Sequence, residues 1–246
     1  KAFSDGEAEI GVSALAVRLG IAKSTVHRLA STLVAEGMLE QNPETGRYRL
    51  GIALFGLGAL VRRRMNLSTE AKPFLLDLRE RTNETVLLAI PADGEIMVIY
   101  NLESTQAIRM RSDIGVRQPA WCTAVGRAIF AFHGEDAVER MLAGPLKART
   151  PKTVTDSGAL RAALAEVRRR GYAVEDEESE AGMRCVAAPV RDASGDVAAA
   201  VAVAGPVQRL SVDALAAMAA PVIETAASIS ARLGYHPGAV GQDGRG

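Results

Sequence analysis

The sequence has few of the residues that build disulfide frameworks or metal centres. Its 246 residues include two cysteines, three histidines and one tryptophan. Two cysteines, Cys122 and Cys185, do not make a disulfide framework, and no signal-peptide pattern is found. We therefore expect a protein of the reducing cytoplasm.

Long hydrophobic runs and catalytic motifs are also scarce. The longest uncharged apolar run in the front half of the chain, residues 50–61, has twelve residues, whereas a membrane-spanning helix needs about 20. The sequence contains neither a glycine-rich phosphate loop nor a Ser-His-Asp elbow. We therefore expect no membrane partner, no cofactor and no catalytic residue.

Acidic residues are concentrated in one run, Glu175–Glu180, which holds five carboxylates in six residues. A metal ion could bind there, but no histidine lies nearby to complete a mixed ligand set, and most such runs are solvated. Cys185 has only Arg184 beside it to favour a thiolate, so it is interpreted as a core or pocket residue rather than a nucleophile. We expect no metal site.

Charge is distributed unevenly, although the formal net charge is zero. Residues 11–64 carry eight Lys and Arg against three Asp and Glu, whereas residues 65–246 carry 20 against 23. A chain of this length is expected to form roughly two domains of about 100–200 residues each. A basic front domain on a mildly acidic body favours phosphate contact by the front domain alone.

The front of the chain has the pattern of two short helices joined by a tight turn. Residues 13–19 and 24–36 are the predicted helices, and Gly20 between them permits a left-handed turn conformation. The second helix is expected to bury an apolar stripe at helical spacing, made of Val26, Leu29, Ala30, Leu33 and Val34. Residues 38–50 predict a β-hairpin, which completes a winged helix-turn-helix.

Polar and basic residues gather on the outward face of the second predicted helix and in the hairpin. The predicted DNA-binding residues are Lys23, Ser24, Thr25, His27, Arg28, Ser31, Arg47 and Arg49. Hydroxyl groups and lysine near a helix N-terminus suit phosphates, and arginine can bind the O6 and N7 atoms of guanine. The alternative is the solvated face of an ordinary helix pair; the hairpin and the basic charge favour double-stranded DNA.

Four segments are predicted along the chain. We expect a winged helix-turn-helix DNA-binding domain at residues 1–51, a linker and dimerisation helix at 52–67, an effector-binding domain at 68–235 and a disordered tail at 236–246. Residues 52–65 are apolar on nearly every side, so the linker helix is expected to pack against its copy in a dimer.

The predicted effector domain mixes helices with one antiparallel sheet, which is the α+β class. The predicted helices span residues 70–81, 123–133, 135–142, 156–170 and 212–233. The predicted strands span residues 86–90, 96–100, 107–111, 185–191 and 197–204.

Several motifs follow one another along the chain, notably Ile21–Leu29, Gly46–Gly51, Pro119–Ala128, Arg170–Glu178 and Gly182–Pro189. In this order they resemble the isocitrate lyase regulator (IclR) family of bacterial transcription factors, over about residues 10–234. The resemblance implies a winged helix-turn-helix, a linker helix and an effector domain of GAF-like or profilin-like fold. It also implies DNA binding as dimers or pairs of dimers, and a response to small organic acids, aromatic acids or sugar acids.

The resemblance also implies an effector pocket in the second domain. Its positions fall on Ala107, Met110, Gln118, Ala124, Val125, Glu175, Met183, Cys185, Ala202 and Ala204. Ala202 and Ala204 stand where relatives that bind small keto acids can carry serines, and Glu175 stands where the family often has Asp. With Trp121 and Met183 expected to widen the apolar wall, an aromatic or larger aliphatic acid is indicated.

The segment Thr123–Gly126 is predicted to open a helix in this pocket. Free backbone N–H groups at a helix start could hold the carboxylate of an effector. An ordinary capped helix start is the alternative.

The sequence therefore predicts a ligand-responsive, dimeric or tetrameric transcription regulator, which binds a palindromic operator and a small organic acid. Two other functions remain open. One is a small-molecule-metabolising enzyme with an appended winged helix, and the other is an effector-independent DNA-binding protein.

Overall fold

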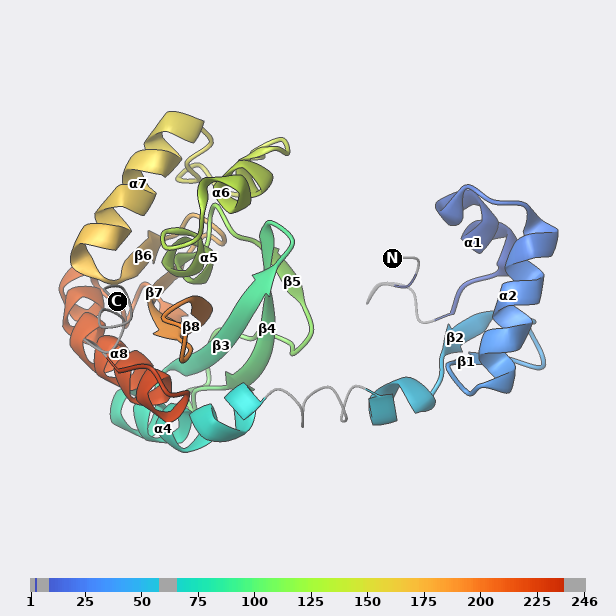
Figure 1. Ribbon diagram of the computed structural model, residues 1–246, viewed down its shortest axis with the longest axis horizontal. Coiled ribbons are helices and arrows are strands. Elements are labelled where there is room, and N and C mark those ends of the chain that lie inside the picture. Colours follow the sequence, from blue (N-terminus) through green and yellow to red (C-terminus); the bar gives the residue numbers. More distant parts are fainter. Residues whose placement is uncertain (1–2, 4–8, 58–65, 237–246) are drawn as a thin grey trace, which may run out of the picture. The chain divides into compact units, whose positions relative to one another are not determined.

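The computed structural model describes residues 3, 9–57 and 66–236, and it divides the chain into two compact units, Lys1–Asn66 and Leu67–Gly246 (Figure 1). Residues 58–65 of the predicted linker helix lie outside the described residues, as does the predicted tail apart from His236, which is exposed. The two units are described separately below.

The N-terminal unit is a helix pair followed by a hairpin. Its elements are α1 (Val12–Leu19), α2 (Lys23–Ala35), β1 (Leu39–Gln41) and β2 (Tyr48–Leu50), and the two strands pair antiparallel. Gly20 ends α1 at φ 67°, where its backbone N–H donates to the carbonyls of Ala16 and Val17. A left-handed φ of this kind costs least for glycine, which confirms the predicted turn at Gly20. The two helices followed by the hairpin confirm the predicted winged helix-turn-helix.

The core of this unit is small, consisting of Ile10, Leu15, Val26, Ala30, Leu39 and Tyr48. The predicted stripe on α2 is wrong in part: Val26 and Ala30 are buried, but Leu29 is 50% exposed and Leu33 is 38% exposed. The five-residue stripe is wider than the face of α2 that α1 and the hairpin cover. Leu29 and Leu33 therefore remain accessible in the single chain.

The described part of the predicted linker helix is short. Residues 53–57 are helical, and Leu54, Phe55 and Leu57 are exposed in the single chain. Among the described residues of this unit, none covers these three side chains, and the packing of the linker helix against a second copy stays a prediction.

The C-terminal unit is built on a six-stranded antiparallel sheet with strand order β5-β4-β3-β8-β7-β6. The strands are β3 (Thr85–Ala92), β4 (Glu95–Leu102), β5 (Arg117–Pro119), β6 (Ala173–Asp176), β7 (Met183–Arg191) and β8 (Val197–Pro206). The helices are α4 (Asn66–Thr82), α5 (Ala124–Phe130), α6 (Glu135–Leu142), α7 (Ser157–Arg170) and α8 (Val212–Arg232). This confirms the predicted α+β class.

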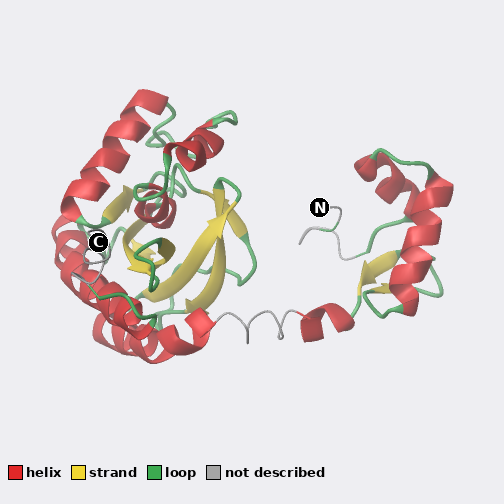
Figure 2. Ribbon diagram, viewed as in Figure 1, coloured by secondary structure: helices red, strands yellow, loops and turns green. Residues whose placement is uncertain are grey.

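Helices cover both faces of this sheet (Figure 2). On β3, Val86 and Leu88 pack with α4 and α8, whereas Leu87 and Ala89 pack with the side of α5, α6 and α7. Because successive side chains on a strand point to opposite faces, a strand covered on both sides is apolar throughout. This explains the unbroken apolar run that predicted β3.

Helix α8 is the one described helix that is long and apolar enough to cross a membrane by length and composition alone. Its apolar face instead packs on the sheet, through Leu215, Val222 and Ile229 among others. A core helix of this kind meets the same length and composition test.

Two strand predictions differ from the structure. Residues 107–111 do not form a strand; residues 103–116 are irregular and are tied down by Thr85 Oγ1, which donates to Met110 O at 2.9 Å. The edge of β4 pairs instead with β5, in which Gln118 lies opposite Ile96. Strand β6 was not predicted, because the inward position Glu175 interrupts the apolar alternation that indicates a strand.

Candidate functional site

The outward face of α2 carries the predicted DNA-binding residues of the helix. Lys23, Ser24, His27, Arg28 and Ser31 are exposed and Thr25 is half-buried. Ala22, at the N-cap, makes no side-chain cap hydrogen bond to α2. Backbone N–H groups at such a helix start suit an incoming phosphate.

Ser31 on α2 and Arg49 in the hairpin have hydrogen-bond partners within the single chain. The Ser31 hydroxyl donates to His27 O at 2.9 Å, so only its oxygen lone pairs remain for DNA. Arg49 Nε donates to Glu40 Oε2 at 2.8 Å across the hairpin, where the two residues lie opposite each other. Arg47 is exposed beside β2. The structure therefore brings the helix residues together on one face and compensates the charge of Arg49.

A small cavity of about 30 Å3 lies in the C-terminal unit, between the sheet and the N-terminal end of α5. It brings together eight of the ten predicted pocket residues: Met110, Gln118, Ala124, Val125, Glu175, Met183, Cys185 and Ala204. Ala107 lies instead on the exposed irregular segment, and Ala202 is buried in the core.

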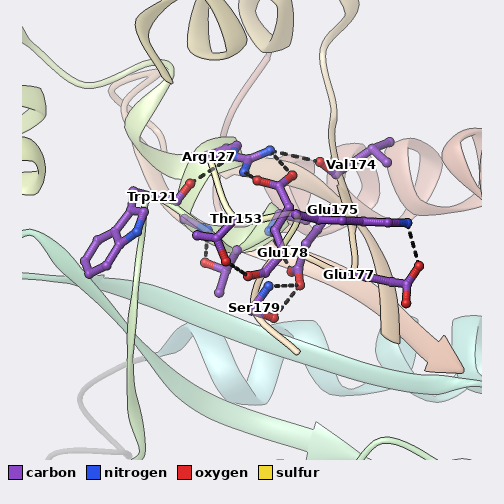
Figure 3. Close-up of polar contacts among 12 residues, drawn as sticks. Trp121, Arg127, Thr153, Val174, Glu175, Glu177, Glu178 and Ser179 are labelled. Carbon is purple, nitrogen blue, oxygen red and sulfur yellow. Dashed lines mark hydrogen bonds and ion pairs between the residues drawn. The ribbon is translucent and has the colours of Figure 1, made fainter. Parts of the chain in front are cut away.

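The cavity is also lined by Thr123, from the predicted helix start, and by residues that were not predicted: Leu87, Ile96, Ser179, Glu180 and Arg184. Ser179 and Glu180 follow Glu175 closely in the sequence, and this closeness to a predicted pocket residue indicates that they can line the same cavity. Trp121, expected in the pocket wall, is not among the lining residues, and its ring points away from Glu175 and Ser179 in Figure 3.

Glu175 is the central polar group of the cavity and is only 4% exposed. Its Oε2 accepts a hydrogen bond from Ala124 N at 3.3 Å, and its Oε1 accepts from Ser179 N at 3.0 Å and from the Ser179 hydroxyl (Figure 3). Burial raises the pKa of Glu175, although these hydrogen bonds and Arg127 act to lower it.

The predicted helix start at residues 123–126 is confirmed as a capped one. Thr123 Oγ1 accepts from Gly126 N at 3.2 Å, which is an N-cap hydrogen bond. The next donor, Ala124 N, is taken by Glu175. A carboxylate of the protein thus occupies the position expected for the carboxylate of a ligand.

The acidic run that begins in β6 is only partly solvated, which corrects the expectation of a solvated run: Glu175 and Glu178 are buried, whereas Glu180 is exposed. Glu178 is buried and pairs with Arg127, whose Nη1 donates to Glu178 Oε1 at 2.8 Å and whose Nε donates to Trp121 O at 3.0 Å. Lys152 Nζ lies 3.0 Å from Asp176 Oδ2 and 2.6 Å from Glu177 Oε1. The loop between β6 and β7 folds over α5, and this buries the carboxylates of Glu175 and Glu178.

Partners of opposite charge lower two pKa values in this run. Arg184, followed by Lys152, lowers the pKa of Asp176, and Lys152 lowers that of Glu177. Among the described residues, no group of three or more His, Cys, Asp or Glu side chains could hold a metal ion. Three carboxylates of the run, those of Asp176, Glu177 and Glu178, form ion pairs with Arg184, Lys152 or Arg127.

Both cysteines are buried, and burial disfavours the charged thiolate form of each side chain. Burial raises the pKa of Cys122 to about 11 and raises that of Cys185 well above its ordinary value. A thiol that stays protonated at neutral pH is a poor nucleophile, which agrees with the interpretation of Cys185 as a pocket-lining residue.

Comparison with known proteins accounts for both units. Residues 1–43 match the IclR helix-turn-helix domain, and residues 59–231 match the C-terminal domain of the bacterial transcriptional regulator IclR. The chain belongs to the IclR family of bacterial transcriptional regulators. It is therefore a DNA-binding transcriptional regulator and not an enzyme.

Relatives of this IclR-family regulator cover nearly its whole length. It is 36% identical to the HTH-type transcriptional regulator KdgR of Escherichia coli, over 94% of this chain and 88% of that protein. An IclR regulator from a Silicibacter species has a similar structure, with a TM-score of 0.87 at 32% identity, over 95% of this chain and 92% of the other.

A solved relative from Microbacterium hydrocarbonoxydans has a ligand bound. This IclR homologue, complexed with 4-hydroxybenzoate, has a TM-score of 0.82 to this chain at 28% identity, with 94% of each chain covered.

Proposed function

We propose that this IclR-family regulator acts in the cytoplasm as a dimer or tetramer whose operator binding changes when a small organic acid enters the cavity of the C-terminal unit. The observation that carries the proposal is the convergence of eight expected pocket residues around one cavity, from the sheet, α5 and the segment that holds Met110. The complex of a homologue with 4-hydroxybenzoate supports an aromatic acid as one member of the ligand class.

The described cavity corresponds to a closed state of the proposed site. Its volume of about 30 Å3 is far below the roughly 300–1,000 Å3 of ligand sites, so part of the wall must move. Most of the wall consists of paired strands and α5, whereas Met110 lies on the irregular segment 103–116. Ligand entry is therefore expected to displace the part of this segment around Met110, which is joined to the sheet by the hydrogen bond from Thr85 Oγ1 and not by strand pairing.

Coupling to DNA would pass through the residues that join the two units. A ligand can change operator affinity only if it binds one arrangement of the DNA-binding units better than another. We infer that ligand binding shifts the linker helix of residues 52–67 in each subunit of the dimer. This shift alters the spacing between the two α2 helices that contact DNA.

The test is operator affinity with and without acid. An operator is first selected from random duplex DNA with the full-length protein, and its dissociation constant is then measured with and without 4-hydroxybenzoate and a panel of other carboxylic acids. An effector present at 100 times its dissociation constant should also stabilise the protein by about 2.7 kcal/mol. If no acid changes the operator affinity, the proposal is wrong, and the result favours the alternative of an effector-independent DNA-binding protein.

A further inference from the structure

The charged groups that line the cavity do not favour an anionic ligand. The lining includes the carboxylates of Glu175 and Glu180 and one cationic side chain, Arg184. Arg184 Nε donates to Asp176 Oδ1 at 2.6 Å and its Nη1 donates to Leu210 O at 2.8 Å, so its charge is already compensated. The cavity thus has a net negative lining, although the proposed ligands are acids.

The elements packed around Glu175 do not supply a further cation. From α5, Arg127 approaches, but its guanidinium forms a bidentate pair with Glu178. From β7, Cys185 lies opposite Glu175, and before α5 lies Cys122; both thiols are neutral at pH 7. Arg149 Nε donates to Ser179 O rather than to a carboxylate.

Two carboxylates that share such an environment cannot both stay ionised, because their repulsion raises the proton affinity of one of them. Resting on the function proposed above, we infer that the cavity binds an acid anion together with one proton from solvent, which converts Glu175 to a carboxylic acid that donates a hydrogen bond to the carboxylate of the ligand. The proton balance is one proton taken up for each anion bound.

The geometry around Glu175 indicates where this proton goes. Oε1 accepts two hydrogen bonds from Ser179, whereas Oε2 accepts only the 3.3 Å contact from Ala124 N, which is near the limit of hydrogen bonding. Protonation of Oε2 therefore disturbs the weaker contact and leaves the Ser179 hydrogen bonds in place. Burial acts in the same direction, because it raises the pKa of Glu175.

The expected sign of the pH dependence follows from this balance. Free carboxylic acids are already ionised above about pH 5, so the ligand itself does not titrate at higher pH. Below the pKa of Glu175 in the folded, ligand-free protein, the site already holds its proton and affinity is constant. Above that pKa, the dissociation constant rises about tenfold for each pH unit.

The experiment measures binding of 4-hydroxybenzoate, benzoate, pyruvate and D-gluconate to the full chain from about pH 5.5 to about pH 8.5, a range in which the carboxylates of these ligands stay ionised. Thermal stabilisation identifies the acids that bind. Calorimetry in two buffers of different ionisation enthalpy then counts the protons taken up. Glu175→Gln, which imitates the neutral acid, should abolish both the pH slope and the proton uptake.

Two further variants distinguish the roles of the neighbouring groups. Glu180→Gln removes the exposed carboxylate of the lining and should keep the tenfold slope. Ser179→Ala removes a donor that favours the ionised form of Glu175, so the pH at which affinity begins to fall should move upward. Ser179→Ala keeps the inference testable if Glu175→Gln does not fold.

The outcomes separate this inference from the proposed function. Acids that bind with a pH-independent dissociation constant and without proton uptake overturn the proton linkage but leave the effector proposal intact. A panel in which no acid stabilises the wild type or Glu175→Gln at any pH overturns the organic-acid class and this inference together. A tenfold slope that Glu175→Gln abolishes and Glu180→Gln retains is the supporting result.

Discussion

Arg127 and Glu178 form an ion pair in which both side chains are buried. Removing one partner leaves an uncompensated buried charge, which costs about 3–5 kcal/mol. We therefore expect Arg127→Met to lower the free energy of unfolding by about this amount, measured by urea denaturation at neutral pH. The loss includes the hydrogen bonds from Arg127 to Trp121 O and Val174 O.

A double variant and a surface control make this prediction specific. Arg127→Met combined with Glu178→Leu removes both charges and should recover most of the loss, since apolar replacements of buried pairs are often tolerated. Arg169→Ala breaks an exposed pair with Glu166 and should leave the urea midpoint unchanged. Equal midpoints for Arg127→Met and Arg169→Ala would contradict a stabilising role for the buried pair.

The same two residues show which part of the site the sequence could not predict. Glu178 lies 51 residues after Arg127, and nothing in the local pattern of the acidic run indicates that the chain returns to α5. Solvation was the reasonable expectation for such a run. The burial of Glu175 also involves a contact with α5, the hydrogen bond from Ala124 N, which the local pattern does not indicate. Only the family resemblance places Glu175 in the pocket.

Among the elements, α2 carries the DNA-binding prediction with the sharpest outcome. Arg28 is exposed on its outward face. If Arg28 contacts a base, Arg28→Ala should weaken operator binding by about 1–3 kcal/mol and relax specificity at one base-pair position. Competition between the selected operator and its single-position variants measures this. A uniform loss on all sequences, with a smaller salt dependence, would instead identify a phosphate contact.

Element prediction succeeded where the local pattern determines the element. Helix α7 begins at the Asp156 cap, whose Oδ2 accepts from Ala159 N at 2.7 Å, and α2, predicted over residues 24–36, spans Lys23–Ala35. Strands were less predictable because a strand also needs a partner. Residues 107–111 have strand-like side chains but no neighbouring strand, whereas the three residues of β5 pair with β4.

For the whole molecule, the exposed apolar residues of the N-terminal unit favour assembly with a second copy. Phe55 is 77% exposed, and Leu29, Leu50 and Ile52 are exposed in the same unit. We expect a second copy to cover these side chains, because apolar side chains gathered on a surface are typical of protein–protein contacts. A palindromic operator presents two equivalent half-sites, and a symmetric dimer can bind both at once.

This assembly predicts a defined effect of one substitution. A charge at Phe55 would have to be buried in the dimer, and losing a buried aromatic anchor costs about 2 kcal/mol or more. Phe55→Lys should therefore raise the dimer dissociation constant by at least about tenfold, measured by analytical ultracentrifugation, and make operator binding depend more steeply on protein concentration. Ile108→Lys is the matched control, because Ile108 is 72% exposed but lies on the other unit. If both variants remain dimers to the same low concentration, residues near Phe55 do not form the dimer contact, and effector binding must alter DNA affinity through another interface.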